Sequence, residues 1–177
     1  MSTSLASSLG FAKIASTDTI REVLRTQISS TARPALHRSS FEPAGGSASE
    51  DWKETVQALS EGVLAVIERA ISKGTDLLLE GVHYVPNKKV IDLWREAGGV
   101  AIGVVLYVSS EERHRGMIAN REKHNGKKVD HYLGNLDRIR EIQEELVLSG
   151  SEFGWLVIDP TKAVSYTHLT LPTNACV

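Results

Sequence analysis

The sequence predicts an α/β fold in which helices cover both faces of a parallel sheet. Four short segments are mostly apolar, at residues 11–15, 77–82, 100–108 and 155–158, and segments with helical spacing separate them. Strands that are apolar on both faces are typical of parallel sheets buried between two layers of helices. Polar residues follow each apolar segment directly, and ligands bind at this edge in open parallel sheets.

The first strand, at 11–15, is followed by a helix. Thr19 and Glu22 have the spacing of a capping box, which marks the start of a helix. Residues 33–46 hold two prolines and a glycine pair and are expected to form a loop.

The next helix is long. Ser47 and Glu50 form a second capping box ahead of apolar residues that recur every three or four positions, and Gly74 ends the pattern. A strand at 77–82 and a helix at 89–97 follow.

The second half repeats this alternation. An unbroken apolar strand is expected at 100–108, a polar and basic segment at 109–126, a helix at 129–148 and a last strand at 155–158. The four strands therefore predict a three-layer α/β domain with one parallel sheet.

Composition excludes several classes of protein. The chain has 177 residues, 20 Lys+Arg, 22 Asp+Glu and a formal net charge of −2. This length is enough to bury a sizeable core, and the balanced charge argues against a general nucleic-acid binder. No apolar run approaches the roughly 18 residues of a membrane span, and no secretory leader is visible, so we expect a cytoplasmic protein.

Asp18 and Arg21 are the first candidate site residues, just after the first strand. A carboxylate at this edge could accept a proton from a substrate hydroxyl, and an arginine three residues later could bind an anionic substrate. The alternative is that Asp18 only caps the helix and Arg21 is solvated.

Further candidates lie in the loop and after the second strand. Arg38 suits a phosphate or a carboxylate, with His37 and Ser39 beside it, although an exposed polar loop would have the same composition. Glu80 ends an apolar strand, where a buried carboxylate would need a cation, a metal-bound water or a neighbouring helix as partner, and His83 follows it.

Bases outnumber acids between residues 113 and 140, a segment that could close over transferring phosphates. A solvated helical face is the alternative for its lysines. No metal site is expected here, because His114, His124 and His131 lack ligand spacing and no cysteine lies nearby.

Residues 164–173 resemble the translation of a transposase adapter used in DNA library preparation. We therefore expect two parts, a domain at 1–163 and an adapter-derived tail at 164–177, the tail being set aside from fold reasoning. The single cysteine, Cys176, falls in this tail.

The sequence resembles the P-loop small-molecule kinases, most closely the 2-phosphoglycerate kinase family, through five stretches at residues 15–25, 34–41, 77–86, 106–115 and 132–143. The resemblance implies a three-layer fold around a phosphate-loop strand. It also implies that ATP and Mg²⁺ are co-substrates and that the γ-phosphoryl group passes to a hydroxyl of a small anionic acid. For that family, the acceptor is 2-phosphoglycerate and the product is 2,3-bisphosphoglycerate.

The resemblance also implies roles for individual residues. Catalytic roles are expected for Asp18, Glu80 and Arg121. Substrate-binding roles are expected for Arg21, His37, Arg38, Ser39, His83 and Arg140. The arginines expected in a lid over the phosphates are Arg113, Arg115 and Arg121.

The phosphate loop itself is missing, because no G-x-x-x-x-G-K-[ST] occurs in the sequence. Residues 2–10 resemble the helix that follows such a loop, so we expect a partial kinase domain that lacks its central first strand and is inactive alone. The alternatives are a non-catalytic nucleotide-sensing or interaction domain and a P-loop kinase for another hydroxyl substrate, since a fold does not decide a substrate.

Overall fold

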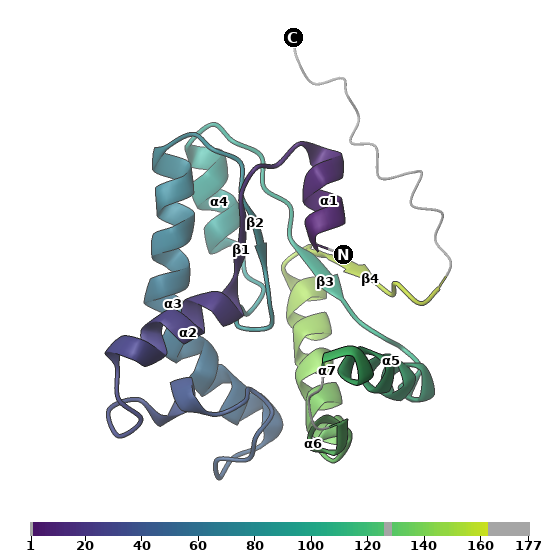
Figure 1. Cartoon of the computed structure of the whole chain (residues 1–177). Helices are drawn as coiled ribbons and strands as arrows, with labels where there is room; N and C mark the ends of the chain where they lie inside the picture. Colours follow the sequence, from purple (N-terminus) through teal and green to yellow (C-terminus); the bar gives the residue numbers. More distant parts are fainter. Residues whose placement is uncertain (1, 126–128, 163–177) are drawn as a thin grey trace.

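The computed structural model of the chain describes residues 2–125 and 129–162, and its strands form two parallel pairs (Figure 1). β1 (Ile14–Ser16) pairs with β2 (Leu78–Glu80), and β3 (Val104–Leu106) pairs with β4 (Leu156–Ile158). The predicted mixed α/β class with parallel strands is confirmed. No strand among the described residues joins β2 to β3, so the strands form two pairs with a gap between them, which agrees with the expectation that the central first strand is missing.

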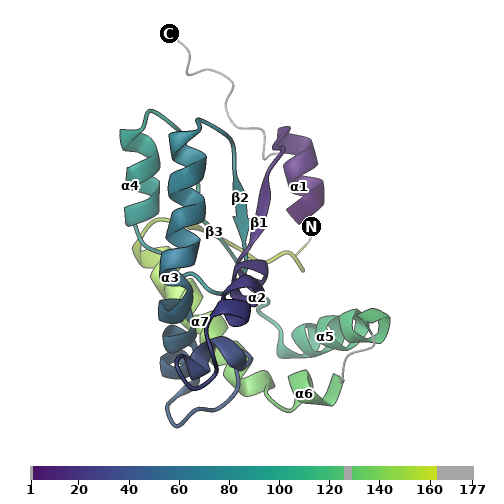
Figure 2. The ribbon, with the colours of Figure 1, turned by 60° about the vertical axis from the view of Figure 1, so that its left-hand side comes forward.

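Helices surround the first pair. Their bounds are α1 (Ser2–Leu9), α2 (Thr17–Gln27), the 3₁₀ helix η1 (Pro34–His37), α3 (Ala48–Ser72) and α4 (Lys89–Glu96). Figure 2 shows the β1–β2 pair between α3 and α4 on one side and α1 on the other. This half of the chain therefore has the three layers that the apolar strands predict.

The second pair is covered by one long helix. α7 (Leu136–Glu152) packs against β3 and β4, and a Cβ built on its Gly150 would lie 2.7 Å from Val105, so the helix approaches the strands closely. α5 (Glu111–Asn125) and α6 (Val129–Leu133) lie beside the lower end of α7 (Figure 1). Since α7 also contacts α3, it joins the two halves.

Only one of the two predicted capping boxes forms. The Ser47 side chain accepts from the Glu50 amide, and the Glu50 carboxylate accepts from the Ser47 amide, as predicted. The box at Thr19 is wrong, because α2 begins at Thr17 with Ser16 as its N-cap, which makes no side-chain cap bond.

All four predicted strands are shorter than expected, and one predicted helix is divided in two. The strand at 100–108 covers only Val104–Leu106, because its partner β4 is itself three residues long. The helix expected at 129–148 is split into α6 and α7 at Gly134, where the chain turns. The basic segment at 109–126 forms α5.

The core has two clusters. The first holds Leu36, Leu59, Val63 and Ile67, and partly buried apolar residues of α2, β2 and α4 pack against it. The second holds Ala48, Trp52 and Ile142, where α3 meets α7. These clusters fix α3 against both halves of the chain.

The tail predicted at 164–177 lies outside the described residues. Among the described helices, none combines the length and the apolar character that crossing a membrane requires.

Candidate functional site

Polar side chains gather at the carboxyl ends of β1 and β2, as the strand pattern predicts. The two strands run parallel with Ser16 opposite Glu80, so the residues that follow them reach the same edge. Thr17, Asp18 and Arg21 come from the first two turns of α2, and His83 comes from the loop after β2. This shared edge is the candidate site.

His83 lies at the centre of the site and is buried, with 1% of its surface exposed. Its Nδ1 lies 3.0 Å from the Thr17 hydroxyl and its Nε2 lies 2.6 Å from the Ser40 hydroxyl. Burial lowers the pKa of His83 to about 4; Asp18 opposes the shift and Arg21 adds to it. His83 is therefore a neutral ring that holds two hydroxyls, and both ring nitrogens are used within the protein.

Gly81 allows Thr17 to come this close. Its φ is +133°, and a Cβ built there would lie 1.9 Å from the Thr17 hydroxyl. A side chain at this position would displace the threonine, so the glycine makes room for a neighbouring strand end.

Arg21 and Arg38 form the cationic part of the site. Arg21 lies 3.4 Å from the Asp18 carboxylate and donates to the Arg38 carbonyl at 3.4 Å. The Arg38 guanidinium donates to Glu54 at 3.0 Å and to the Asp51 carbonyl. In the described structure, the Nε of each arginine is buried without a hydrogen-bond partner. Each guanidinium therefore keeps a donor for an acceptor that the protein does not supply.

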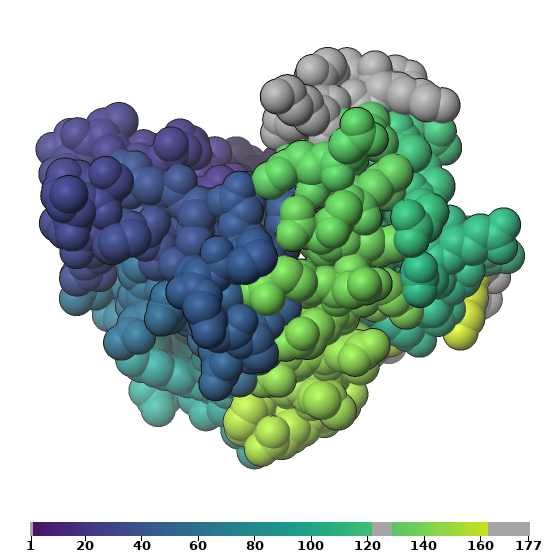
Figure 3. Space-filling view, turned by 90° about the horizontal axis from the view of Figure 1, so that it is seen from below, coloured from purple at the N-terminus to yellow at the C-terminus, as the bar shows by residue number. Residues whose placement is uncertain are grey.

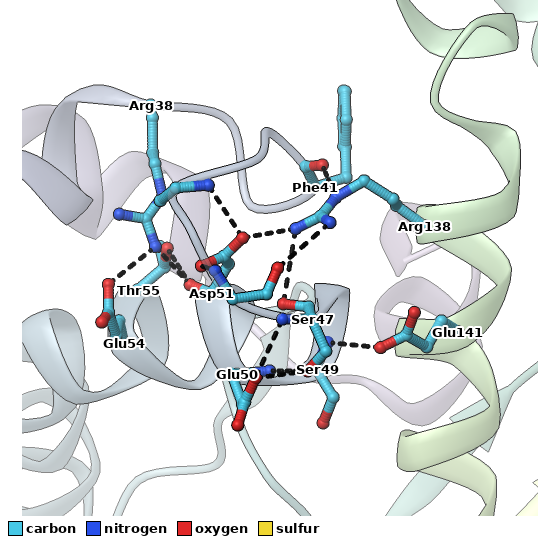
Figure 4. A network of polar contacts seen from close by, with 12 residues as sticks. Arg38, Phe41, Ser47, Ser49, Glu50, Asp51, Glu54, Thr55, Arg138 and Glu141 are labelled. Carbon is cyan, nitrogen blue, oxygen red and sulfur yellow. Dashed lines mark hydrogen bonds and ion pairs between the residues drawn. The ribbon is translucent and has the colours of Figure 1, made fainter.

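A second network fixes the loop that follows Arg38, and Figure 4 shows it from close by. Asp51 accepts from the amides of Ala44 at 2.8 Å and Gly46 at 3.1 Å, and also from the Arg138 guanidinium of α7. Arg138 donates in addition to the Phe41 carbonyl at 2.9 Å. The Ala44 amide, above all, lowers the pKa of Asp51, so this carboxylate stays ionised in its buried position.

Figure 3 shows the blue loop segment against the green surface of α6 and α7. The Phe41 ring contributes to this contact, with centroid distances of 5.2 Å to His131 and 5.3 Å to Tyr132. The sequence analysis did not assign a role to Arg138 or to Asp51. The only signal in the sequence was an acidic residue, Asp51, that follows a glycine pair closely, and this signal did not identify Arg138 as its partner.

Three other residues predicted for this region, Glu80, His37 and Ser39, do not join the Arg21–Arg38 pair in the structure. Glu80 is exposed and has no salt bridge in the described structure, so its expected burial at a strand end is wrong. The His37 ring lies 2.8 Å from the Ile28 carbonyl, a contact within the loop. Ser39 donates its amide to Glu42 at 2.7 Å.

The predicted lid arginines lie on α5. Arg113 donates to the Thr161 carbonyl at 2.9 Å, and Arg115 pairs with Glu111 at 3.2 Å. The guanidinium carbon of Arg121 lies 5.3 Å from the centre of a tyrosine ring in α6. The structure therefore places all three on one helix, and each of them is engaged in a contact within the protein.

The end of β3 holds a different set of polar groups. Asp159 accepts from the hydroxyls of Ser109 at 2.5 Å and Thr161 at 2.6 Å, and these bonds, the Ser109 one first, hold its pKa far below the ordinary value. Arg140 donates to the carbonyls of Val108 at 3.3 Å and Ser109 at 3.4 Å. Arg140 thus contacts the backbone that follows β3, and the carboxylate of Asp159 is occupied by hydrogen bonds from the loops after β3 and β4.

The described residues do not by themselves fit Mg²⁺ or the phosphates of ATP. Within the ranges that the structure covers, no group of three or more His, Cys, Asp or Glu could hold a metal ion. The sequence also lacks the glycine-rich loop and lysine that cradle nucleotide phosphates. No chemical step is therefore derived through either group.

Comparison with known proteins identifies relatives. The 2-phosphoglycerate kinase of Pyrococcus furiosus is 31% identical over 167 residues, which cover 90% of this chain and 54% of that protein. The 2-phosphoglycerate kinase of Methanococcus vannielii is 34% identical over 161 residues, with 84% and 51% covered. That of Methanocaldococcus jannaschii is 28% identical over 165 residues, with 89% and 53% covered.

No family model and no solved structure matches the chain. The chain spans about half the length of the curated relatives it matches. The similarity covers 84–90% of this chain. The chain is thus a homologue of part of the 2-phosphoglycerate kinases.

Proposed function

We propose that the chain carries the acceptor-binding part of an ATP-dependent kinase, which transfers a γ-phosphoryl group to a hydroxyl of a small anionic acid. The acceptor is 2-phosphoglycerate, the product is 2,3-bisphosphoglycerate, and ATP with Mg²⁺ is the phosphoryl donor. The homology to 2-phosphoglycerate kinases supports the reaction class. The geometry of the site supports the proposal that this chain binds the acceptor.

The observation that carries the proposal is the pair of guanidinium groups at the end of β1. Arg21 and Arg38 are mostly buried, with side-chain exposures of 17% and 15%, and each keeps a buried Nε without a partner in the described structure. Buried polar atoms without partners are rare, and a missing ligand or ion is one of their ordinary causes. Guanidinium groups bind carboxylate and phosphate with two parallel hydrogen bonds, and the proposed acceptor has both groups.

Asp18 is placed to act on the acceptor hydroxyl. Its side chain is 61% exposed and lies 3.4 Å from Arg21, so an anion held by Arg21 would lie next to this carboxylate. A carboxylate in hydrogen-bond reach of a hydroxyl can accept its proton as the oxygen attacks. Glu80 is exposed at the neighbouring strand end, and the arginines of α5 are proposed to cover the reacting phosphates.

Calorimetric titration of the 177-residue chain with 2-phosphoglycerate tests the acceptor site. Arg21→Gln should weaken binding about tenfold or more, since a hydrogen bond to a charged group contributes roughly 1.5–3 kcal/mol. Arg25→Gln is the matched control, because Arg25 lies one turn further along α2 and pairs with Glu22 at 2.8 Å. Equal affinities of the wild type and Arg21→Gln would contradict the proposal.

A non-catalytic binding domain is the second candidate, favoured by the missing phosphate-loop motif in this sequence. Release of ADP from ATP, Mg²⁺ and 2-phosphoglycerate separates the two when it is assayed with a longer chain, in which a strand and a G-x-x-x-x-G-K-[ST] loop precede this sequence. Turnover by that longer chain that falls by orders of magnitude in Asp18→Asn supports the kinase with Asp18 as its base. Binding of 2-phosphoglycerate by the longer chain without ADP release supports the second candidate.

A further inference from the structure

A cavity of about 130 Å³ lies between α3 and the start of α4, two helices that run side by side (Figure 2). Half of the residues that line it are apolar, and four of these recur at helical spacing on one face of α3. The apolar lining residues are Val56, Val63, Leu64, Ile67 and Val90. Neither arginine of the proposed acceptor site lines this cavity.

Contacts outside the cavity fix its walls. The His83 ring, which forms part of the lining, is held at both nitrogens by hydroxyl groups. The Tyr84 ring stacks on Trp155 with the ring centroids 5.8 Å apart, and its hydroxyl donates to Asn87 at 3.3 Å. Because these groups would lose their contacts by moving inward, the cavity is preformed, as small-molecule sites usually are.

The polar groups of the lining offer little to water. The Asn87 side chain is used at both ends, by the Val85 carbonyl at 2.8 Å and by the Lys89 backbone amide at 2.9 Å. The Ser60 hydroxyl donates to the Gln57 carbonyl at 2.9 Å. A water molecule in a cavity needs roughly two to four polar partners, so water is held weakly here. An apolar group that displaces weakly held water gains affinity.

Lys89 gives the cavity a positive charge. Its side chain is exposed and lies in the lining, so it marks the side on which the cavity opens to solvent. Within the described structure, its ammonium group has no hydrogen bond and no ion pair. Asp92, the first acidic residue of α4, lies 4.0 Å from Arg95 instead. An anionic group at this opening would therefore meet a cation whose donors are free.

The size of the cavity suits a single aromatic ring. Benzene fills an apolar cavity of about 150 Å³ in another protein. The cavity beside α3 is slightly smaller but open on one side, so a ring can enter it with a substituent directed towards solvent.

We propose that this cavity binds a small carboxylic acid whose apolar part has the size of one aromatic ring, with the carboxylate at Lys89. The ring packs against the apolar face of α3 and against His83, so the ligand stabilises the loop that follows β2. The proposal does not rest on the acceptor site, because it requires neither Arg21 nor Arg38.

Benzoate is the probe, and methyl NMR of the 177-residue chain at constant ionic strength locates it. Ring currents should shift the methyl signals of Val63 and Ile67 in a saturable way. Val23 and Leu148, which are 60% and 67% exposed, report non-specific binding and should not shift. Benzamide has the same ring without the charge and should bind about threefold more weakly, as expected for loss of one exposed ion pair. Acetate has the charge without the ring and should leave the cavity signals unchanged.

One pair of variants tests the position of the ring. Ser60→Leu adds an apolar side chain at the edge of the cavity and should weaken benzoate binding about tenfold or more, because the space is filled. Ser72→Leu is the matched control, since Ser72 also lies on α3 and donates to a carbonyl three residues earlier but does not line the cavity.

A second pair tests the carboxylate. Lys89→Gln should weaken benzoate binding about threefold and leave benzamide binding unchanged. Lys88→Gln should change neither, since Lys88 is exposed but does not line the cavity.

Three results would overturn the inference: shifts at Val23 and Leu148 as large as those in the cavity, full benzoate affinity in Ser60→Leu, or equal affinities for benzoate and benzamide. Its failure can be distinguished from failure of the acceptor site. Arg21→Gln should weaken 2-phosphoglycerate binding and leave the benzoate shift of Val63 intact.

Discussion

Replacing His83 tests whether the centre of the site is held by a neutral ring. The pKa of His83 is near 4 in the folded chain and has a reference value of 6.5. Between these values the unfolded chain binds more protons, so acid favours unfolding as the pH falls through this window. The arithmetic of one site gives a loss of about 2 kcal/mol in unfolding free energy between pH 7 and pH 5, and about 3 kcal/mol by pH 3.

The variant His83→Gln keeps a polar side chain but cannot titrate in this range. Its unfolding free energy should therefore lack that pH-dependent loss, whatever its stability at pH 7. Urea denaturation followed by tryptophan fluorescence at pH 7, 6 and 5 measures both proteins, since the chain has three tryptophans. The difference between the two slopes isolates His83 from the other histidines.

The size of that slope difference decides the result. If wild type and His83→Gln lose the same free energy between pH 7 and pH 5, then His83 is not a buried neutral ring between two hydroxyls. A wild-type chain that gains stability as the pH falls would contradict the sign as well. Either outcome would remove the basis for placing Thr17 and Ser40 through this ring.

Three further variants, one of them a control, test the surroundings of the site. Gly81→Ala should lower the unfolding free energy by about 2 kcal/mol or more, because its φ of +133° disfavours a side chain and the added Cβ would meet Thr17. The control Gly116→Ala on α5 should instead raise the unfolding free energy by about 0.5–1 kcal/mol, since an added Cβ would meet no other atom and alanine favours the helix. Thermal unfolding compares the two variants, and equal effects on stability would refute the argument. Arg138→Gln should speed amide exchange at Gly46 about tenfold in hydrogen-exchange NMR, because the Asp51 carboxylate loses its charged partner; unchanged exchange would show that α7 does not hold the loop.

The order of the elements was predictable because it depends on local pattern. Apolar periodicity placed the long helix α3, and the Ser47–Glu50 capping box located its start. The breaks are harder, since one glycine at position 134 was enough to divide a predicted helix into two. Which strands pair with each other was not predictable in the same way, because strand pairing depends on contacts between backbone segments that are far apart in the sequence.

The same distinction applies to the site. The rule that polar residues after parallel strands share one edge brought Asp18, Arg21 and His83 together correctly. It did not indicate that His83 would be buried between Thr17 and Ser40, a contact that joins residues 43 positions apart for the serine. Nor did it identify the Asp51–Arg138 pair, whose partners are 87 positions apart. Neither contact has a local pattern in the sequence.

These two long-range contacts make the proposed acceptor site depend on both halves of the chain. His83 attaches the loop after Arg38 to the end of β2, and Arg138 attaches the same loop to α7, which packs on β3 and β4. Because this loop is attached to both halves of the chain, a movement of one half relative to the other would strain one of its two attachments. The position of Arg38, and therefore the geometry offered to an anion, is set by how the two strand pairs sit relative to each other through α3 and α7.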